Sequence, residues 1–181
     1  YDMLHDFNNR LNVISLDGKI AASFKGNTNL SITHDYDFLT YYLDRRYDNA
    51  GSTRIVINTS PIELISFNSN ISFGKEIAYN DENPELGKDF SFIKNLGLQI
   101  NDNFSISNLF SFSRLKKIES NQYYYNGFIN RLNFKYQFSK SIGIRIASEY
   151  NNFTESIFFQ PLFEWTPNPF TIFYLGGNQN L

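Results

Sequence analysis

The chain has 181 residues, which is enough for one domain or for a section of a larger one. A formal net charge of -2 and a pI near 5.7 argue against a nucleic-acid-binding protein, because such proteins normally present a basic surface. Cysteine is absent, which excludes disulfides, cysteine-based zinc sites and thiol nucleophiles. Aromatic residues make up 18% of the chain, a content that favours β-strands with many ring-bearing surface positions.

The first half of the chain alternates between apolar and polar residues with the period of two that marks a β-strand. Residues 1–10 are polar and indicate a loop or the end of a preceding strand, without the basic start and apolar core of a signal peptide. The first strand extends from 11 to 25 and the second from 30 to 42, separated by a turn. A polar loop is predicted at 44–52.

The alternation predicts eight more strands. The third, around 55–57, is predicted to be short and to stop at Ser60-Pro61, whereas the fourth, 65–79, is predicted to be the longest. A second polar loop is expected at 80–89. Further strands are expected at 92–100, 104–112, 128–138, 142–150, 157–165 and 170–176, joined by connections at 101–103, 117–122, 139–141, 151–155 and 167–169.

The clearest pattern lies between residues 128 and 150. Two long runs alternate apolar with polar residues on either side of Ser139-Lys140-Ser141, which predicts an antiparallel hairpin. Each arm approaches the ~9–11 residues of a tilted strand that crosses a bilayer. We therefore interpret the hairpin as transmembrane, with its apolar face toward lipid.

The register of this hairpin can be predicted from its turn. If Phe138 pairs with Ile142, Arg131 lies opposite Glu149 and Lys135 lies opposite Arg145. The first pair is favourable. The second pair brings like charges together and needs a carboxylate from a neighbouring strand, for which Glu164 is the candidate.

The predicted connections alternate between short turns and mostly longer loops. Bacterial outer-membrane barrels have this layout, with short turns on one rim and longer loops on the other. Tyrosines gather where strands meet the longer loops, as in the aromatic girdles of such barrels. The sequence thus predicts an all-β fold: an antiparallel up-and-down transmembrane β-barrel with about ten strands.

The polar faces of these strands carry charges of both signs. In a barrel they would line a hydrated lumen whose charges pair with one another, rather than a strongly selective ion filter. The predicted lumen-lining residues are Asp35, Asp37, Glu76, Arg131, Lys135, Arg145 and Glu149.

Three possible chemical sites have simpler explanations. A Ser/His pair would have to use His5 or His34, and His34 lies on the apolar face of its strand, in step with Ile32 and Tyr36. Asp35 and Asp37 resemble paired glycosidase carboxylates, but their spacing on one strand face is diagnostic of no catalytic geometry and is better explained by a solvated pore wall. The acidic residues near Asn83-Pro84 (Asp81, Glu82, Glu85 and Asp89) lack the spacing of a calcium-binding loop. No catalytic, cofactor-binding or metal site is predicted, and no cofactor.

A resemblance to a known family rests on segments 131–141, 145–151, 160–163 and 167–176. Together they resemble the C-terminal barrel of a poorly characterised family of outer-membrane proteins from Bacteroidota, over roughly residues 128–176. Members carry an N-terminal domain similar to family-nine carbohydrate-binding modules. The resemblance implies an outer-membrane location and no catalytic residue. On this basis we expect residues 1–181 to be one barrel segment, incomplete at both ends and an arc of a larger barrel.

Three hypotheses for function follow. The first is a non-enzymatic outer-membrane barrel that acts as a channel or transporter, or as the membrane anchor of an N-terminal domain. The second is a barrel subunit or client of a larger outer-membrane assembly. The third is a soluble β-meander that binds carbohydrate. The expected partners are the lipid bilayer with its lipopolysaccharide and other outer-membrane proteins, and no nucleic acid.

Overall fold

The protein folds into one antiparallel β-sheet. The computed structural model describes residues 2–5, 11–79 and 82–180. The strands are β1 (Asp2–His5), β2 (Leu11–Phe24), β3 (Thr28–Tyr42), β4 (Arg45–Ile62), β5 (Ile65–Ile77), β6 (Leu86–Asn101), β7 (Phe104–Lys117), β8 (Tyr123–Ser139), β9 (Ile142–Asn151), β10 (Ser156–Asn168), β11 (Thr171–Gly176) and β12 (Gln179–Asn180). The described residues include no helix with the length and apolar character needed to span a membrane.

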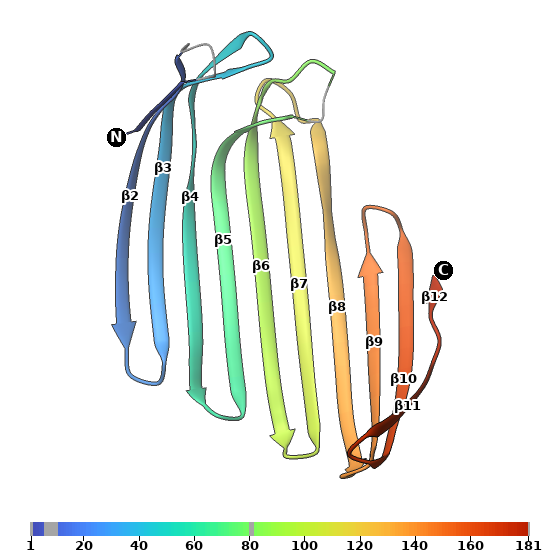
Figure 1. Ribbon diagram of the computed structural model, residues 1–181. Helices are drawn as coiled ribbons and strands as arrows, with labels where there is room; N and C mark the ends of the chain where they lie inside the picture. Colours follow the sequence, from blue (N-terminus) through green and yellow to red (C-terminus); the bar gives the residue numbers. More distant parts are fainter. Residues whose placement is uncertain (1, 6–10, 80–81, 181) are drawn as a thin grey trace.

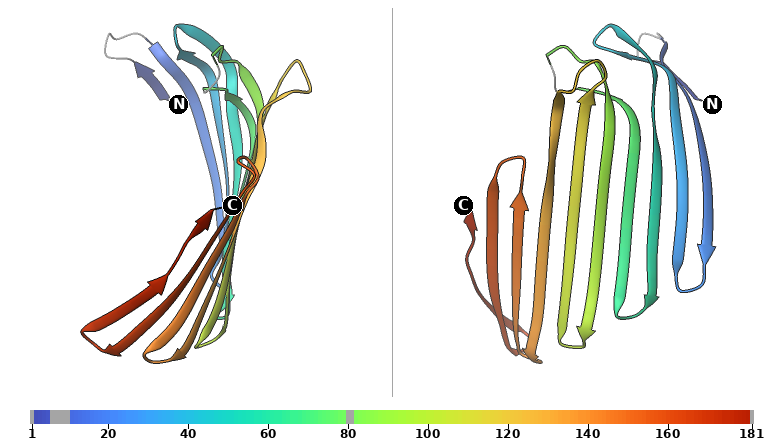
Figure 2. Two further views of the ribbon diagram at one scale, coloured as in Figure 1. Left: turned by 90° about the vertical axis from the view of Figure 1, so that its right-hand side faces the viewer. Right: turned by 180° about the vertical axis from the view of Figure 1, so that it is seen from behind.

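The strands follow one another through the sheet in chain order. Strands β1 to β11 are hydrogen-bonded in sequence, and β12 pairs with β10 (Figure 1). The sheet is a single curved layer, and the edge formed by β1 and β2 is not joined to the edge formed by β10 to β12 (Figure 2). The all-β, up-and-down prediction is confirmed. Closure of the sheet into a barrel stays a prediction.

Cross-strand register sorts the side chains into two faces. On one face, seven consecutive Cα partners from β2 to β8 form an unbroken apolar row, which consists of Ile20, Ile32, Ile55, Ile71, Phe92, Phe112 and Phe128. On the other face, five partners form a polar row, which consists of Ser23, Asn29, Asn58, Asn68 and Asn95. Hydrogen bonds link neighbours in the polar row, including Ser23 Oγ to Asn29 Oδ1 at 2.7 Å. We call these surfaces the apolar face and the polar face.

No second layer covers the apolar face. Ile20 is 76% exposed and Phe138 is 60% exposed, and no large side chain of the described residues is fully buried. The buried hydrophobic residues lie instead in the parts of β3–β7 near one rim, and they are Leu39, Tyr47, Ala50, Ile77, Ala78 and Leu115. Because a soluble sheet normally buries one face against another element, this arrangement leaves a large apolar surface unpartnered.

The connections follow the predicted sorting, with one exception. Turns at 25–27, 63–64, 102–103, 140–141 and 169–170 lie on one rim, and connections at 43–44, 78–85, 118–122 and 152–155 lie on the other (Figure 1). Three connections on the second rim are longer than any turn on the first. The exception is 43–44, which is a two-residue turn and not the polar loop predicted at 44–52.

Strand β4 is where the sequence prediction was wrong. Segment 55–57 was expected to be the shortest strand, but β4 has 18 residues and is the longest strand, and β5, expected to be longest, has 13. The turn before β4 uses Leu43 and Asp44, both with positive φ (50° and 58°), as a type I′ hairpin turn requires. The dipeptide Leu43-Asp44 differs from the Asn-Gly that normally marks such a turn, so the sequence did not predict a turn here.

Two other boundaries differ from the predictions. Pro61 does not end a strand. It lies in β4, where the pairing with β5 shifts between Thr59 and Ile62, and such irregularities tolerate a residue without an N–H donor. Residues 2–5, expected to be loop or the end of a preceding strand, form β1 and pair with β2. The sheet therefore has twelve strands in place of about ten.

Gly51 tests how closely β3 and β4 are packed. Its φ is 134°, and a Cβ at this position would overlap the Asp35 carbonyl oxygen and lie 2.9 Å from the Tyr36 Cα. We expect Gly51→Ala to lower the free energy of unfolding by roughly 1–3 kcal/mol, the cost of a strained backbone position. Equilibrium unfolding in denaturant measures this change.

Gly18→Ala is the matched control for Gly51→Ala. A Cβ on Gly18 meets no atom within 4 Å, and alanine is favoured over glycine in a strand by roughly 0.5–1 kcal/mol. Gly18→Ala is therefore expected to be neutral or stabilising. Equal losses in the two variants would contradict the close β3–β4 approach.

Candidate functional site on the polar face

The polar face is built mostly from small polar side chains. In β5 it carries Ser66, Asn68, Asn70 and Ser72, and in β7 it carries Ser105, Ser107, Ser111 and Ser113. Small side chains leave hollows between the larger charged residues. All seven residues predicted to line a lumen lie on this face, in two groups with an ion pair between them.

The first group is acidic and lies toward the rim of the longer connections. Asp35 is aligned through Ser52 and Gly74 with Asp89, because these four residues are successive Cα partners across β3 to β6. A hollow of about 230 Å³ is lined by Asp35, Asp37, Glu76 and Asp89, together with Arg54 and Tyr79 among others. The register thus gathers carboxylates that are up to 54 residues apart in the sequence.

Tyr79 closes this acidic group at its rim, just beyond the end of β5. Its ring packs edge-on against Tyr42, with ring centroids 4.8 Å apart. Burial, and then the negative charges of Glu76 and Asp37, raise the pKa of Tyr79 above its ordinary value. Tyr79 therefore remains a neutral hydroxyl at physiological pH and can donate a hydrogen bond.

The second group is basic and lies toward the rim of the short turns. Lys135 and Arg145 are Cα partners, as predicted. They line a hollow of about 480 Å³ with Glu63, Gln99 and Asn133 among its other walls. Lys135 and Arg145 also share a smaller hollow of about 110 Å³ with Glu164.

Glu164 does not neutralise the basic pair. Among the described residues, no carboxylate oxygen lies within 4.0 Å of the Lys135 or Arg145 nitrogens. Two cations therefore face each other without an ion-pair partner. The predicted ion pair between Glu164 and these two cations is therefore not formed, although Glu164 shares a hollow with them.

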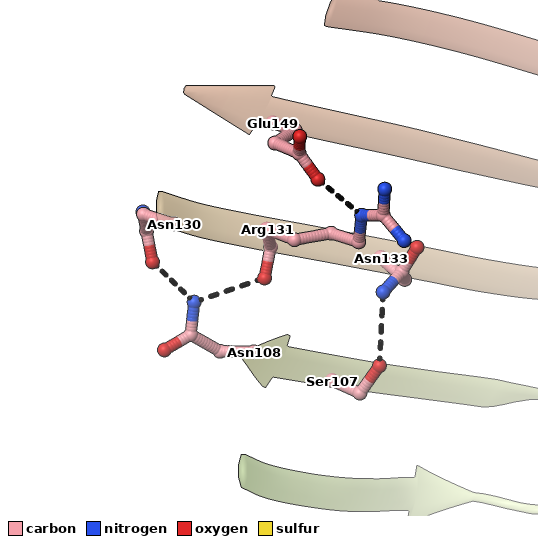
Figure 3. Close-up of polar contacts among 6 residues, drawn as sticks. All are labelled: Ser107, Asn108, Asn130, Arg131, Asn133 and Glu149. Atoms are coloured by element: carbon pink, nitrogen blue, oxygen red, sulfur yellow. Dashed lines mark hydrogen bonds and ion pairs between the residues drawn. The ribbon is translucent and has the colours of Figure 1, made fainter. Parts of the chain in front are cut away.

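Arg131 and Glu149 form an ion pair between the two groups. Arg131 Nε lies 2.6 Å from Glu149 Oε2, and the two residues are Cα partners as predicted (Figure 3). The arginine side chain is 48% exposed, so the pair contributes little to stability in water. Asn133, in the same strand as Arg131, donates from Nδ2 to Ser107 Oγ of β7 at 3.4 Å.

Among the described residues, the candidate chemical groups considered in the sequence are not brought together. His34 Nδ1 lies 2.9 Å from Thr53 Oγ1, so its polar contact is with a threonine. No group of three or more His, Asp or Glu side chains suited to a metal ion occurs in the described residues. The acidic loop considered for calcium includes Asp81, which lies outside those residues. His5 lies at the end of β1.

Sequence reasoning missed Asp89 and three lysines. Asp89 was assigned to a loop, although its alternation with Lys88 and Phe90 continues the β6 pattern. Lys75, Lys88 and Lys116 lie on the apolar face as successive Cα partners, which no single strand reveals. Asp89 and the lysines could have been assigned to a face by continuing the alternation of each strand beyond its last apolar residue.

No profile of a known protein family matches the chain, and neither a curated protein nor a solved structure matches it. The family resemblance noted in the sequence remains an expectation.

Charge-reversal variants test the arrangement of the polar face. Arg145→Glu places a carboxylate opposite Lys135 and is expected to raise the free energy of unfolding, whereas Glu149→Arg creates a second like-charged pair and is expected to lower it. Each change is expected to be roughly 0.2–1 kcal/mol, typical of cross-strand pairs. Denaturant unfolding at low and high salt measures both.

Salt provides the internal control for the charge reversals. At 1 M salt the screening length falls to about 3 Å, so both differences should shrink together. If Arg145→Glu destabilises the protein at low salt, the two cations are not in repulsive contact and the register of charges is misassigned.

Proposed function

We propose that the sheet is a section of the wall of a bacterial outer-membrane β-barrel, with its apolar face against lipid and its polar face toward a water-filled lumen. In this proposal the chain has no enzymatic role. It forms a channel or transporter, or it anchors a further domain in the membrane. The observation that carries the proposal is the height of the apolar band.

The apolar band approaches the height of the lipid-facing band of a membrane-spanning barrel. Strands β5, β6, β7 and β8 each carry a nine-residue segment in which four of five outward positions are apolar, namely 65–73, 90–98, 104–112 and 128–136. Nine residues cover about 27 Å along a strand, or roughly 20 Å along the membrane normal at a tilt of about 40°. A lipid-facing band of ~25 Å is typical of outer-membrane barrels.

Register keeps these segments level with one another. Phe73 pairs with Phe90 at one end of the β5 and β6 segments, and Ile65 pairs with Leu98 at the other end. The β7 and β8 segments pair with each other in the same way, displaced along the sheet by two residues. This two-residue step between β6 and β7 is compatible with the stagger of tilted strands in a barrel.

The polar positions within the band are few, and two of them bond to each other. Asn108 Nδ2 donates to Asn130 Oδ1 at 2.8 Å and to the Arg131 carbonyl oxygen at 3.2 Å (Figure 3). Ser69 is buried. Lys94 is a cation inside the band, and its long aliphatic stem suits it to reach away from the hydrocarbon.

The polar face supports the lumenal half of the proposal. Its hollows are lined by carboxylates near one rim and by a lysine and an arginine near the other. Hydrated charges of both signs are typical of a pore wall and are costly against lipid. The resemblance to Bacteroidota outer-membrane barrels points the same way, as does the sorting of short and long connections. A role as one subunit or client within a larger outer-membrane assembly shares this geometry.

The uncovered apolar face weighs against a soluble carbohydrate-binding meander. Such a protein needs a second layer or a partner over residues such as Ile20 and Phe138, and no described element provides one. The aromatic residues of the apolar face are spread over the height of the band. A carbohydrate site would instead gather them around a polar pocket.

Adjacent positions on β7 give a matched test of the lipid-facing assignment. Phe110→Arg places a charge near the middle of the band and is expected to cost roughly 2–4 kcal/mol of folding free energy in a bilayer, whereas Ser111→Arg on the polar face is expected to cost little. The reciprocal Lys94→Leu change is expected to stabilise. Denaturant unfolding of protein reconstituted in lipid vesicles measures all three. Equal costs for Phe110→Arg and Ser111→Arg would contradict the assignment of faces.

Solubility and conductance test the proposal at two levels. We expect the protein to need detergent for extraction and to migrate differently on a gel before and after heating, because a bilayer replaces the missing second layer. A monodisperse protein without detergent would overturn the membrane proposal. In a planar bilayer, stepwise conductance would identify a pore, and a silent but inserted protein would identify an anchor.

A further inference from the structure

Three lysines form a continuous row on the apolar face. Lys75 of β5 pairs with Lys88 of β6, and Lys88 pairs with Lys116 of β7. Each continues the alternation of its strand on the apolar face, with Phe73 two positions from Lys75, Phe90 two positions from Lys88 and Arg114 two positions from Lys116. The row therefore lies one step beyond the aromatic end of the apolar band, toward the rim of the longer connections.

Lys75 also lines the acidic hollow of the polar face, but none of the three lysines forms an ion pair with a described residue. Across the described residues no carboxylate lies within 4.0 Å of these ammonium groups. Lys116 Nζ contacts Asn121 Oδ1 at 2.8 Å and lies 6.0 Å from the centre of the Tyr123 ring, and both partners are neutral. Lys75 and Lys88 are exposed.

Arg114 adds a fourth cation next to the row. Its guanidinium lies 5.2 Å above the Phe90 ring, at the level of the last aromatic residues of the band. The Cα atoms of directly opposed residues are only about 4.5–5.5 Å apart, and like charges placed opposite each other destabilise a sheet. A row of this kind costs stability unless an anion occupies it.

We propose that Lys75, Lys88 and Lys116 bind the phosphate group of an anionic lipid headgroup in the leaflet at the rim of the longer connections. This inference rests on the proposed membrane location. The row lies two residues, or about 7 Å along the strand, beyond Phe73 and Phe90, which is where hydrocarbon gives way to headgroups. Three lysines on successive Cα partners would present their ammonium groups to a multiply charged phosphate at this level, and the nearby ring of Tyr123 suits the same interfacial depth.

The chemistry favours a lipid phosphate over a soluble anion. A headgroup is held at this depth by its own acyl chains, which would lie against the aromatic band directly below the row. A phosphate from solution has no such second contact and must compete with salt. The lipid therefore binds through charge and apolar contact together.

Reconstitution in two kinds of vesicle tests the proposal. The probe is phosphatidic acid, added as a minor component to phosphatidylcholine vesicles. Binding to the folded state raises the denaturant midpoint, so wild-type protein should unfold later when phosphatidic acid is present. A Lys75→Gln/Lys88→Gln/Lys116→Gln variant should lose this shift completely while still inserting.

A second triple variant controls for net charge. Lys19→Gln/Lys25→Gln/Lys140→Gln removes the same number of charges from positions outside the row and should keep the full shift. Retention of the shift in the row variant, or its loss in the control variant, would overturn the assignment to the row. A matching shift from inorganic phosphate with phosphatidylcholine alone would overturn the assignment to a lipid.

The outcomes also separate this inference from the proposed function. Failure of the wild-type protein to insert into either vesicle would overturn the membrane proposal and the lipid site with it. Insertion into both vesicles with identical midpoints would overturn the lipid site alone.

Discussion

The structure depends on one constraint, which is that cross-strand register does not slip by a residue within the apolar row and the polar row. A slip of one residue would turn every apolar side chain of a strand to the polar face. In a two-layered protein, core packing helps to prevent such a slip. This sheet has no second layer, so register is held by the hydrogen-bonded ladder, by the two-residue turns, and by neighbouring side chains of the same kind, as in the isoleucine–phenylalanine row and the asparagine row. The local bulges lie outside these rows, near the strand ends.

Alternation within single strands carried most of the fold prediction. It identified ten of the strands, the order of connections and the pairing of Arg131 with Glu149. The prediction failed where both faces of a strand have the same surroundings, because apolar and polar residues then need not alternate. Residues 45–52 extend β4 beyond the apolar band, where both faces of the strand can be polar, so the segment looked like a loop. The Leu43-Asp44 turn adds to the difficulty, because its positive φ values depend on the strands it joins and not on residues that favour such angles.

Prediction of the candidate site had a different limit. The seven charged residues on the polar face were identified because each alternates with apolar neighbours in its own strand. Their division into an acidic group and a basic group depends on which strands lie side by side, as does the gathering of Asp89 with Asp35. The lysine row was missed because each lysine, taken alone, is only a polar residue at the end of an apolar run. The pattern of a single strand does not show which residues of other strands lie beside it.

The distribution of cations on the two faces follows from what each face contacts. Lys135 and Arg145 can remain opposite each other on the polar face because water screens them there, and the exposed Arg131–Glu149 pair is correspondingly weak. If the apolar face contacts lipid as proposed, a cation on it is costly at mid-height and favourable only where hydrocarbon ends. Lys75, Lys88 and Lys116 obey this rule as a single level row. Lys94 does not, and its position beside Phe110 makes it the residue at which the same apolar surface is least suited to lipid.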